Sequence, residues 1–118
     1  MSSVREMLSI IVPTYREADN MRPLISRLRA TLEPSTHYEI IVVDDNSPDG
    51  IEDQIVALQK EGAPVRLIRR IGERGLSSAV IRGFQESQGA LLLCMDADLS
   101  HPPRSNPADA QCAGAARR

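Results

Sequence analysis

Apolar residues along the chain follow two patterns. Four short runs are almost continuously apolar, which is typical of parallel strands buried on both faces. Between these runs, apolar residues recur at every third or fourth position, which predicts amphipathic helices. We therefore expect strands at residues 8–12, 38–43, 65–68 and 91–95.

The first predicted helix has one apolar face, made of Met21, Leu24, Ile25, Leu28 and Leu32. Asp19 or Asn20 is expected to cap its amino end. That start would put Pro23 in the first turn, where a helix tolerates proline. Residues 33–35 contain a proline and are expected to end the helix.

A second helix is predicted over residues 51–60, and a third has Leu76, Ala79, Val80, Gly83 and Phe84 on one face. Short connections join each strand to a helix and each helix to the next strand. Such alternation predicts right-handed βαβ units around a parallel sheet. The predicted fold class is α/β, a Rossmann-like parallel sheet with flanking helices.

Composition narrows the class of protein. The 118 residues suit one domain, and 42% hydrophobic with 25% charged residues is ordinary for a globular chain. A net charge of −2 argues against nucleic-acid binding. No apolar run is long enough to span a membrane, and the first residues lack signal-peptide order. Cys94 and Cys112 form no disulfide or metal pattern, so we expect a reducing, cytoplasmic setting.

Candidate chemistry is concentrated where strands end. Asp96 and Asp98 directly follow the fourth predicted strand, at the sheet edge where open α/β folds bind ligands. Paired carboxylates can hold Mg²⁺ or Mn²⁺, which prefer oxygen ligands. The alternative is that these two residues are only the polar start of a surface loop.

Two further loops carry candidate binding residues. After the first strand, Tyr15 could stack on a base or sugar and Glu17 could accept hydrogen bonds, although an exposed turn is the simpler interpretation. After the second strand, one of Asp44 and Asp45 should face the site, and alternation of side chains favours Asp45. A carboxylate there suits the N–H groups of guanine or uracil. Capping of an Asx turn is the alternative.

A basic group of side chains could match a diphosphate or form a solvated positive face: Arg66, Arg69, Arg70, Arg74 and Arg82. Gly75 would let backbone N–H groups approach a phosphate. Neither of the common glycine-rich nucleotide-binding motifs is present. A Ser-His-Asp arrangement is also absent, so nothing supports hydrolytic nucleophilic catalysis.

Four segments together resemble the nucleotide-sugar half of family 2 glycosyltransferases, and most of all the dolichol-phosphate (polyprenol-phosphate) mannosyltransferase branch. The resemblance covers residues 8–103 in the family's order and spacing. The segments are residues 9–17 (SIIVPTYRE), 42–50 (VVDDNSPDG), 75–84 (GLSSAVIRGF) and 95–103 (MDADLSHPP).

The resemblance implies a GT-A fold that transfers mannose from GDP-mannose to a polyprenol phosphate lipid, with inversion and with Mg²⁺ or Mn²⁺. Asp98 would be the catalytic residue and a metal ligand, together with Ser100. The residues that would bind the nucleotide and its diphosphate are Pro13, Tyr15, Glu17, Val43, Asp45, Asp96, Ala97 and Asp98.

The resemblance also implies limits. Residues 1–103 would be the nucleotide-sugar-binding domain, and residues 104–118 a disordered or atypical alanine-rich tail. We expect a truncated member, in which the acceptor half and any contact with the cytoplasmic face of a membrane belong to segments beyond this chain. The uncovered fourth strand could also drive self-association.

Two alternatives remain within this family. One is a fragment that binds a GDP-sugar without transferring it, and the other is a transferase with a different nucleotide-sugar donor. A phosphoacceptor receiver-like domain is disfavoured, because its acidic pair follows the first strand and it adds a late lysine. Here the adjacent pair, Asp44 and Asp45, follows the second strand, and Lys60 is the only lysine.

Overall fold

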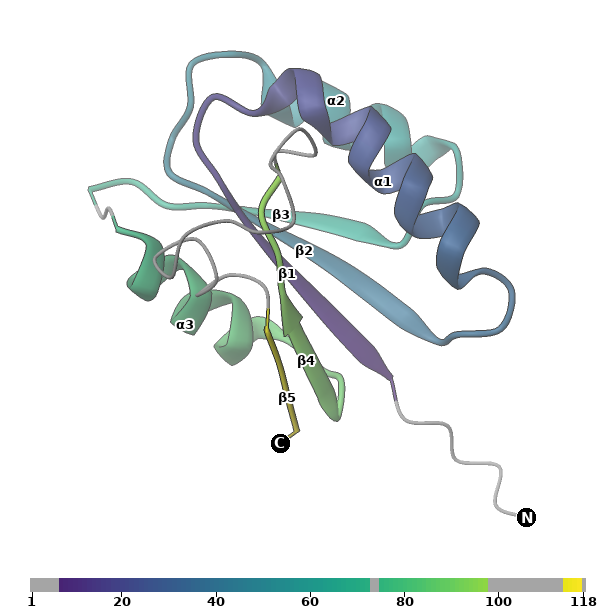
Figure 1. Ribbon diagram of the computed structural model, residues 1–118. Coiled ribbons are helices and arrows are strands. Elements are labelled where there is room, and N and C mark those ends of the chain that lie inside the picture. The colour runs from purple at the N-terminus through teal and green to yellow at the C-terminus, as the bar shows by residue number, and fades with distance from the viewer. Residues whose placement is uncertain (1–6, 73–74, 98–113, 118) are drawn as a thin grey trace, which may run out of the picture.

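The computed structural model describes residues 7–72, 75–97 and 114–117. Three helices and five strands are present in this part of the chain (Figure 1). One sheet contains the strands in the order β3-β2-β1-β4-β5. The elements are β1 (Leu8–Thr14), α1 (Ala18–Leu32), β2 (Tyr38–Asp44), α2 (Ile51–Lys60), β3 (Val65–Arg69), α3 (Leu76–Glu86), β4 (Leu91–Cys94) and β5 (Gly114–Arg117).

Helices cover both faces of the sheet, with α1 and α2 on one side and α3 on the other (Figure 1). Alternate residues of β1 separate the two cores. Ile10 points into the cluster formed with α1 and α2, whereas Ile11 points into the smaller cluster formed with α3. Strands β1 to β4 are parallel. The predicted α/β class with a parallel sheet is therefore confirmed.

The first strand is longer than predicted, because Pro13 does not end it. Thr14 O accepts a hydrogen bond from Asp45 N at 3.1 Å, so the backbone groups of Thr14 face β2. Because these groups alternate sides along a strand, the missing N–H of Pro13 faces β4, whose paired residues end at Cys94 opposite Ile11. Proline therefore removes no hydrogen bond from the β1–β2 ladder.

The start of α1 also differs from the prediction. The N-cap residue is Glu17, and no side chain within this turn caps the helix. Instead, Asp49 Oδ2 accepts the hydrogen bond of Ala18 N at 3.1 Å, so a carboxylate from the β2–α2 loop satisfies this amino end. Pro23 consequently lies in the second turn rather than the first.

Strand β5 lies within the segment that was expected to be a disordered or atypical tail. It pairs antiparallel with β4, with Leu91 opposite Arg117 and Cys94 opposite Gly114. The free edge of β4 presents backbone N–H and C=O groups that any extended segment can pair with, whatever its side chains. Residues 104–113 lie outside the described residues.

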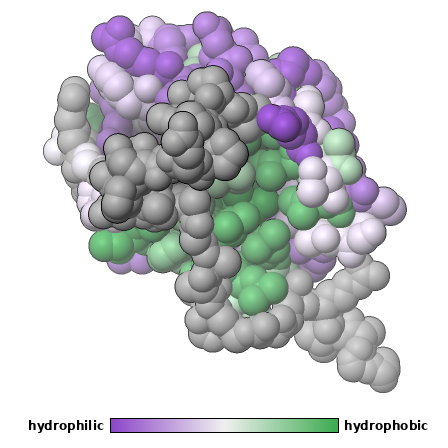
Figure 2. All heavy atoms as spheres, in the orientation of Figure 1, coloured by the Kyte–Doolittle hydropathy of each residue, from purple (hydrophilic) through white to green (hydrophobic). Residues whose placement is uncertain are grey.

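The outer surfaces of α1 and α2 are largely hydrophilic, as the purple upper part of Figure 2 shows. Their inward faces contain the predicted apolar residues, with Met21 and Ile25 of α1 fully buried. Over the residues that the structure describes, no helix has the length and apolar character needed to cross a membrane.

Candidate functional site

The parallel sheet brings the predicted site loops to one edge. Thr14 is opposite Asp44 on β2, and Asp44 is opposite Arg69 on β3. On the other side of β1, Ile11 is opposite Cys94, and Met95 N donates to Ile11 O at 3.0 Å. Continuing this register sets Asp96 beside Pro13. The carboxyl ends of all four parallel strands therefore meet where an open α/β sheet binds ligands.

Asp44 and Asp45 are adjacent but have different surroundings. Asp44 is fully buried, and its Oδ1 accepts hydrogen bonds from Thr14 Oγ1 at 2.8 Å and Ser47 Oγ at 2.7 Å. Its Oδ2 accepts from Ser47 N at 2.7 Å. Asp44 therefore fixes the loop, which is the turn-capping alternative. Asp45 is half-buried and lies at a pocket.

This pocket has a volume of about 210 Å³. Drug-sized ligands occupy roughly 300–1,000 Å³, so the space suits a single ring system rather than a whole sugar nucleotide. It is lined by Pro13, Thr14, Tyr15, Asp45, Gly75 and Ala79. Loops that follow β1, β2 and β3 thus contribute to one concave surface.

Tyr15 is 40% exposed, and the Arg16 guanidinium carbon lies 5.4 Å from its ring centroid. The side-chain hydrogen bond with Tyr15, followed by the charge interaction with the same residue, raises the pKa of Arg16. Arg16 thus stays charged near this aromatic ring. Glu17 is half-buried, and its Oε1 accepts a hydrogen bond from Asn20 Nδ2 at 2.5 Å.

The other predicted nucleotide-binding residues have different positions. Val43 is fully buried in the same cluster as Ala79, which lines the pocket, so it supports the pocket from below. Ala97 is also buried, in the core on the α1 side. Asp96 is half-buried after β4. Asp98 and Ser100 lie outside the described residues.

The predicted basic group does not form a single surface, because each described arginine is paired. Arg66 bonds to Glu86 O and lies 3.5 Å from Glu39, and Arg82 pairs with Glu86 at 3.3 Å. Arg69 pairs with Glu52. Neither a solvated positive face nor a set of diphosphate ligands describes these three residues. Arg74 lies outside the described residues.

Arg70 is the functional candidate that sequence reasoning placed in the wrong class. Its side chain is fully buried, and it pairs with Asp45 at 2.7 Å. Among apolar neighbours in sequence, a buried arginine cannot be distinguished from an exposed one by pattern alone. Thr14 and Ala79, which line the pocket, were also missed, because small side chains have no chemical signature.

Metal ligands are incomplete in the described part of the chain, where no group of three His, Cys, Asp or Glu side chains could hold an ion. Asp96 is a single carboxylate at the expected edge. Mg²⁺ is commonly held by one or two carboxylates together with substrate phosphates. Asp96 therefore fits a partial donor set for a metal–diphosphate complex.

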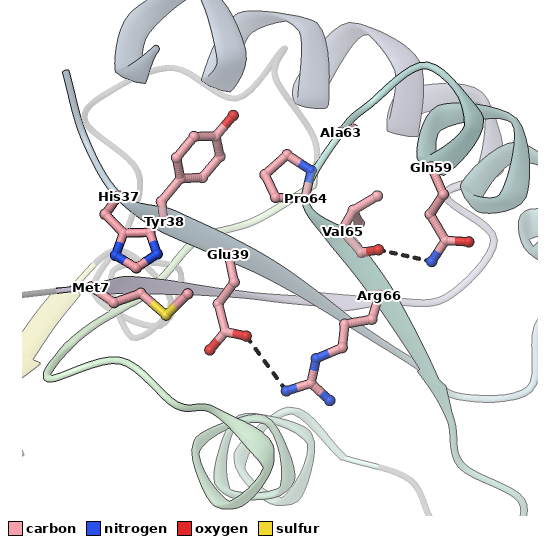
Figure 3. Close-up of a pocket in the computed structure, with 9 residues that line it drawn as sticks. All are labelled: Met7, His37, Tyr38, Glu39, Gln59, Ala63, Pro64, Val65 and Arg66. Carbon is pink, nitrogen blue, oxygen red and sulfur yellow. Dashed lines mark hydrogen bonds and ion pairs between the residues drawn. The ribbon is translucent and has the colours of Figure 1, made fainter. Parts of the chain in front are cut away.

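A second and larger pocket, of about 530 Å³, lies at the amino ends of the strands (Figure 3). Glu39 and Arg66 point toward each other in it, and Gln59 Nε2 donates to Val65 O at 2.8 Å. None of the predicted site residues lines this pocket. Volume alone therefore does not identify the candidate site.

Comparison with known proteins gives related results. The chain is 52% identical over 104 residues to the dolichol-phosphate mannosyltransferase of Mycosarcoma maydis, covering 84% of this chain and 35% of that protein. It is also 52% identical over 101 residues to the enzyme of the same name from Saccharomyces cerevisiae, covering 84% and 38%. The chain thus spans little more than a third of these relatives' length.

Among solved structures, mannosyltransferase PcManGT from Pyrobaculum calidifontis, in complex with GDP-Man and Mn²⁺, is similar with a TM-score of 0.69. It is 26% identical, with 92% of this chain and 32% of that chain covered. This likeness confirms the predicted GT-A relationship of the fold. Residues 9–107 match the family described as Glycosyl transferase family 2. The chain therefore belongs to glycosyltransferase family 2, as its four motifs predict.

Proposed function

We propose that this chain is the donor-binding half of an enzyme that transfers mannose from GDP-mannose to a polyprenol (dolichol) phosphate. Support comes from the relatives that are dolichol-phosphate mannosyltransferases and from the similar mannosyltransferase in complex with GDP-Man and Mn²⁺. The observation that carries the proposal is the pocket in which Pro13, Tyr15 and Asp45 come together at the carboxyl edge of the sheet.

In this proposal the pocket takes the nucleobase. Tyr15 provides a ring for stacking, and Asp45 accepts hydrogen bonds from the N–H edge of guanine. Pro13 forms a wall, and Val43 supports the pocket from the buried side. Glu17 accepts a hydrogen bond from the polar edge of the nucleoside. The small volume agrees with a base bound here and a diphosphate that extends along the edge toward Asp96.

Asp96, Ala97 and Asp98 would meet the ribose and the diphosphate, and Asp98 with Ser100 would hold Mg²⁺ or Mn²⁺. When bound, the ion neutralises negative charge that builds on the departing GDP. Asp98 is the proposed catalytic residue through this contact. Ala97 has its side chain in the core, which leaves its backbone as the group that can approach a ligand.

The reaction needs little acid–base chemistry from the protein. An oxygen of the lipid phosphate, already anionic, attacks the anomeric carbon of mannose. The bond between that carbon and the GDP oxygen breaks, GDP leaves with the electron pair, and the configuration inverts. The protein therefore acts mainly by holding the donor in line with the acceptor.

Titration calorimetry of this chain with GDP-mannose tests the proposal. We expect binding only when Mg²⁺ or Mn²⁺ is present, and we expect Asp98→Ala to abolish that metal dependence. Asp53→Ala, an exposed carboxylate on α2, is the matched control and should bind as the wild type does. Unchanged metal-dependent binding by Asp98→Ala would contradict the assignment.

A second candidate is a fragment that binds GDP-mannose but transfers nothing, which the coverage of only 35% of a relative's length favours. Incubation with radiolabelled GDP-mannose and a polyprenol phosphate distinguishes the two. Mannosyl lipid indicates the transferase, whereas metal-dependent binding without product indicates the fragment. Tighter binding of a UDP-sugar would instead indicate a different donor.

A further inference from the structure

Arg70 follows β3, and its side chain is fully buried. Its guanidinium makes several contacts at once. Nε donates to Asp45 Oδ1 at 2.8 Å, and Nη2 lies 2.7 Å from the same oxygen. Nη1 donates to Ser78 Oγ at 2.8 Å, and Nη2 also donates to Gly75 O at 3.1 Å. Burying a charge of this kind is costly unless it is paired, and here Asp45 pairs it.

These contacts connect two walls of the candidate pocket. Asp45 belongs to the loop after β2, whereas Gly75 and Ser78 belong to the start of α3. Asp45 and Gly75 line the pocket, but Arg70 does not. Arg70 N also donates to Asp44 O at 2.8 Å, so its own backbone is tied to β2. Any effect of Arg70 on a ligand therefore acts through Asp45 and the first turn of α3.

The Asp45 carboxylate is held in one orientation. Both contacting nitrogens of Arg70 meet Oδ1. Within residues 7–72 and 75–97, no side chain or backbone group donates to Oδ2. Oδ2 is consequently the oxygen left to accept hydrogen bonds from a ligand. Without Arg70, the carboxylate could rotate and cap its own loop, as Asp and Asn commonly do.

We propose that Arg70 is the positioning residue for nucleobase selection: it orients Asp45 so that the pocket accepts a base with an N–H donor edge and rejects one with an acceptor there. This inference rests on the proposed function, in which Asp45 meets guanine. Guanine presents N–H donors to such a carboxylate, whereas adenine presents the N1 lone pair at the same position. A fixed carboxylate therefore attracts the first base and repels the second.

The test is the ratio of the dissociation constants for ADP and GDP, measured by calorimetry with Mn²⁺. The two nucleotides share a ribose and a diphosphate, so the ratio isolates the base. Hydrogen bonds to a charged group are worth about 1.5–3 kcal/mol, so the wild type should prefer GDP by about tenfold or more. We expect Asp45→Ala and Arg70→Met each to bring the ratio to within about threefold of unity.

A double variant separates positioning from a general structural role. Because Arg70 acts through Asp45, adding Arg70→Met to Asp45→Ala should leave the ratio where Asp45→Ala alone sets it. Arg82→Met, which removes a paired arginine on the half-exposed side of α3, is the control and should keep the wild-type ratio. If Arg70→Met weakens GDP and ADP equally and the ratio stays at the wild-type value, the inference is overturned.

Two further measurements keep the outcome interpretable. Should Arg70→Met fail to fold by circular dichroism, Ser78→Ala removes one anchor of the guanidinium from an exposed position. It should lower the ratio by a smaller factor, and an unchanged ratio would count against the inference. If the wild type itself shows no preference for GDP over ADP, then the proposed GDP donor is wrong and this inference falls with it, whereas a failure confined to the variants overturns only the role of Arg70.

Discussion

At the scale of single residues, two neighbouring aspartates divide two tasks. Asp44 has three hydrogen-bond donors from Thr14 and Ser47 and no exposure to solvent, so it shapes the loop. Asp45 has its Oδ1 held by Arg70 and faces the pocket. Side-chain alternation along β2 explains why the two carboxylates cannot share a role.

Asp44→Asn should destabilise the protein although it preserves side-chain volume. The amide has one acceptor oxygen instead of two, so at least one buried donor from Thr14 or Ser47 loses its partner. Such a loss costs about 1–3 kcal/mol in the free energy of unfolding. Urea unfolding measures it. Asp53→Asn on the exposed side of α2 should change the same free energy by no more than about 0.5 kcal/mol. Equal stabilities of the two variants would contradict this account of Asp44.

At the scale of elements, α3 approaches β1 closely at a glycine. A Cβ atom added to Gly83 would overlap Ile11 Cγ2 and lie 3.2 Å from Ile11 Cδ1. Ile11 is fully buried between β1 and α3, so it has little room to move. The absence of a side chain at position 83 therefore sets the distance between this helix and the sheet.

Gly83→Ala should consequently lower stability. Alanine favours a helix by up to about 1 kcal/mol over glycine, but overpacking a well-filled core costs typically about 1–3 kcal/mol. The expected net effect is a loss of about 1 kcal/mol or more, measured by thermal or urea unfolding. Gln85→Ala, two residues away and exposed, should be close to neutral. A stabilised Gly83→Ala protein would show that α3 packs more loosely than described.

At the scale of the whole molecule, carboxylates tie α1 to its neighbours. Arg22 of α1 forms two hydrogen bonds with Glu61 after α2, at 2.8 and 2.7 Å, and these lower the pKa of Glu61. At the other end of α1, the hydrogen bond from Tyr38 and then that from Arg29 lower the pKa of Glu33. Both groups favour their charged form in the folded state.

A carboxylate whose pKa is lowered by folding adds stability above its unfolded pKa and loses it as pH falls through the folded pKa. With an ordinary value of 4.5 for both residues, the urea midpoint should hold between neutral pH and about pH 5 and then decline in more acidic solution. Glu61→Gln should lower the midpoint at neutral pH and make the decline shallower. A decline of the same slope in this variant would argue against the Arg22–Glu61 contribution.

Much of the fold could be predicted because each element carries a local signal. The inward face of α1, with Met21 and Ile25 fully buried, follows from spacing in the sequence. Boundaries were less predictable. Pro13 ends no strand because its missing N–H faces away from β2, and the amino end of α1 is satisfied by Asp49 from another loop. Both outcomes depend on contacts between residues far apart in sequence.

The sequence by itself determined the α/β class, the family and the loops that meet at the site, since apolar periodicity and motif spacing are properties of the chain. Only the tertiary structure decided which charges are available there. Arg66, Arg69 and Arg70 lie within five residues yet have different partners: Glu39, Glu52 and Asp45. Side chains alternate across a strand and meet whichever elements the sheet brings beside them, so burial turned Arg70 from a presumed phosphate ligand into the partner of Asp45.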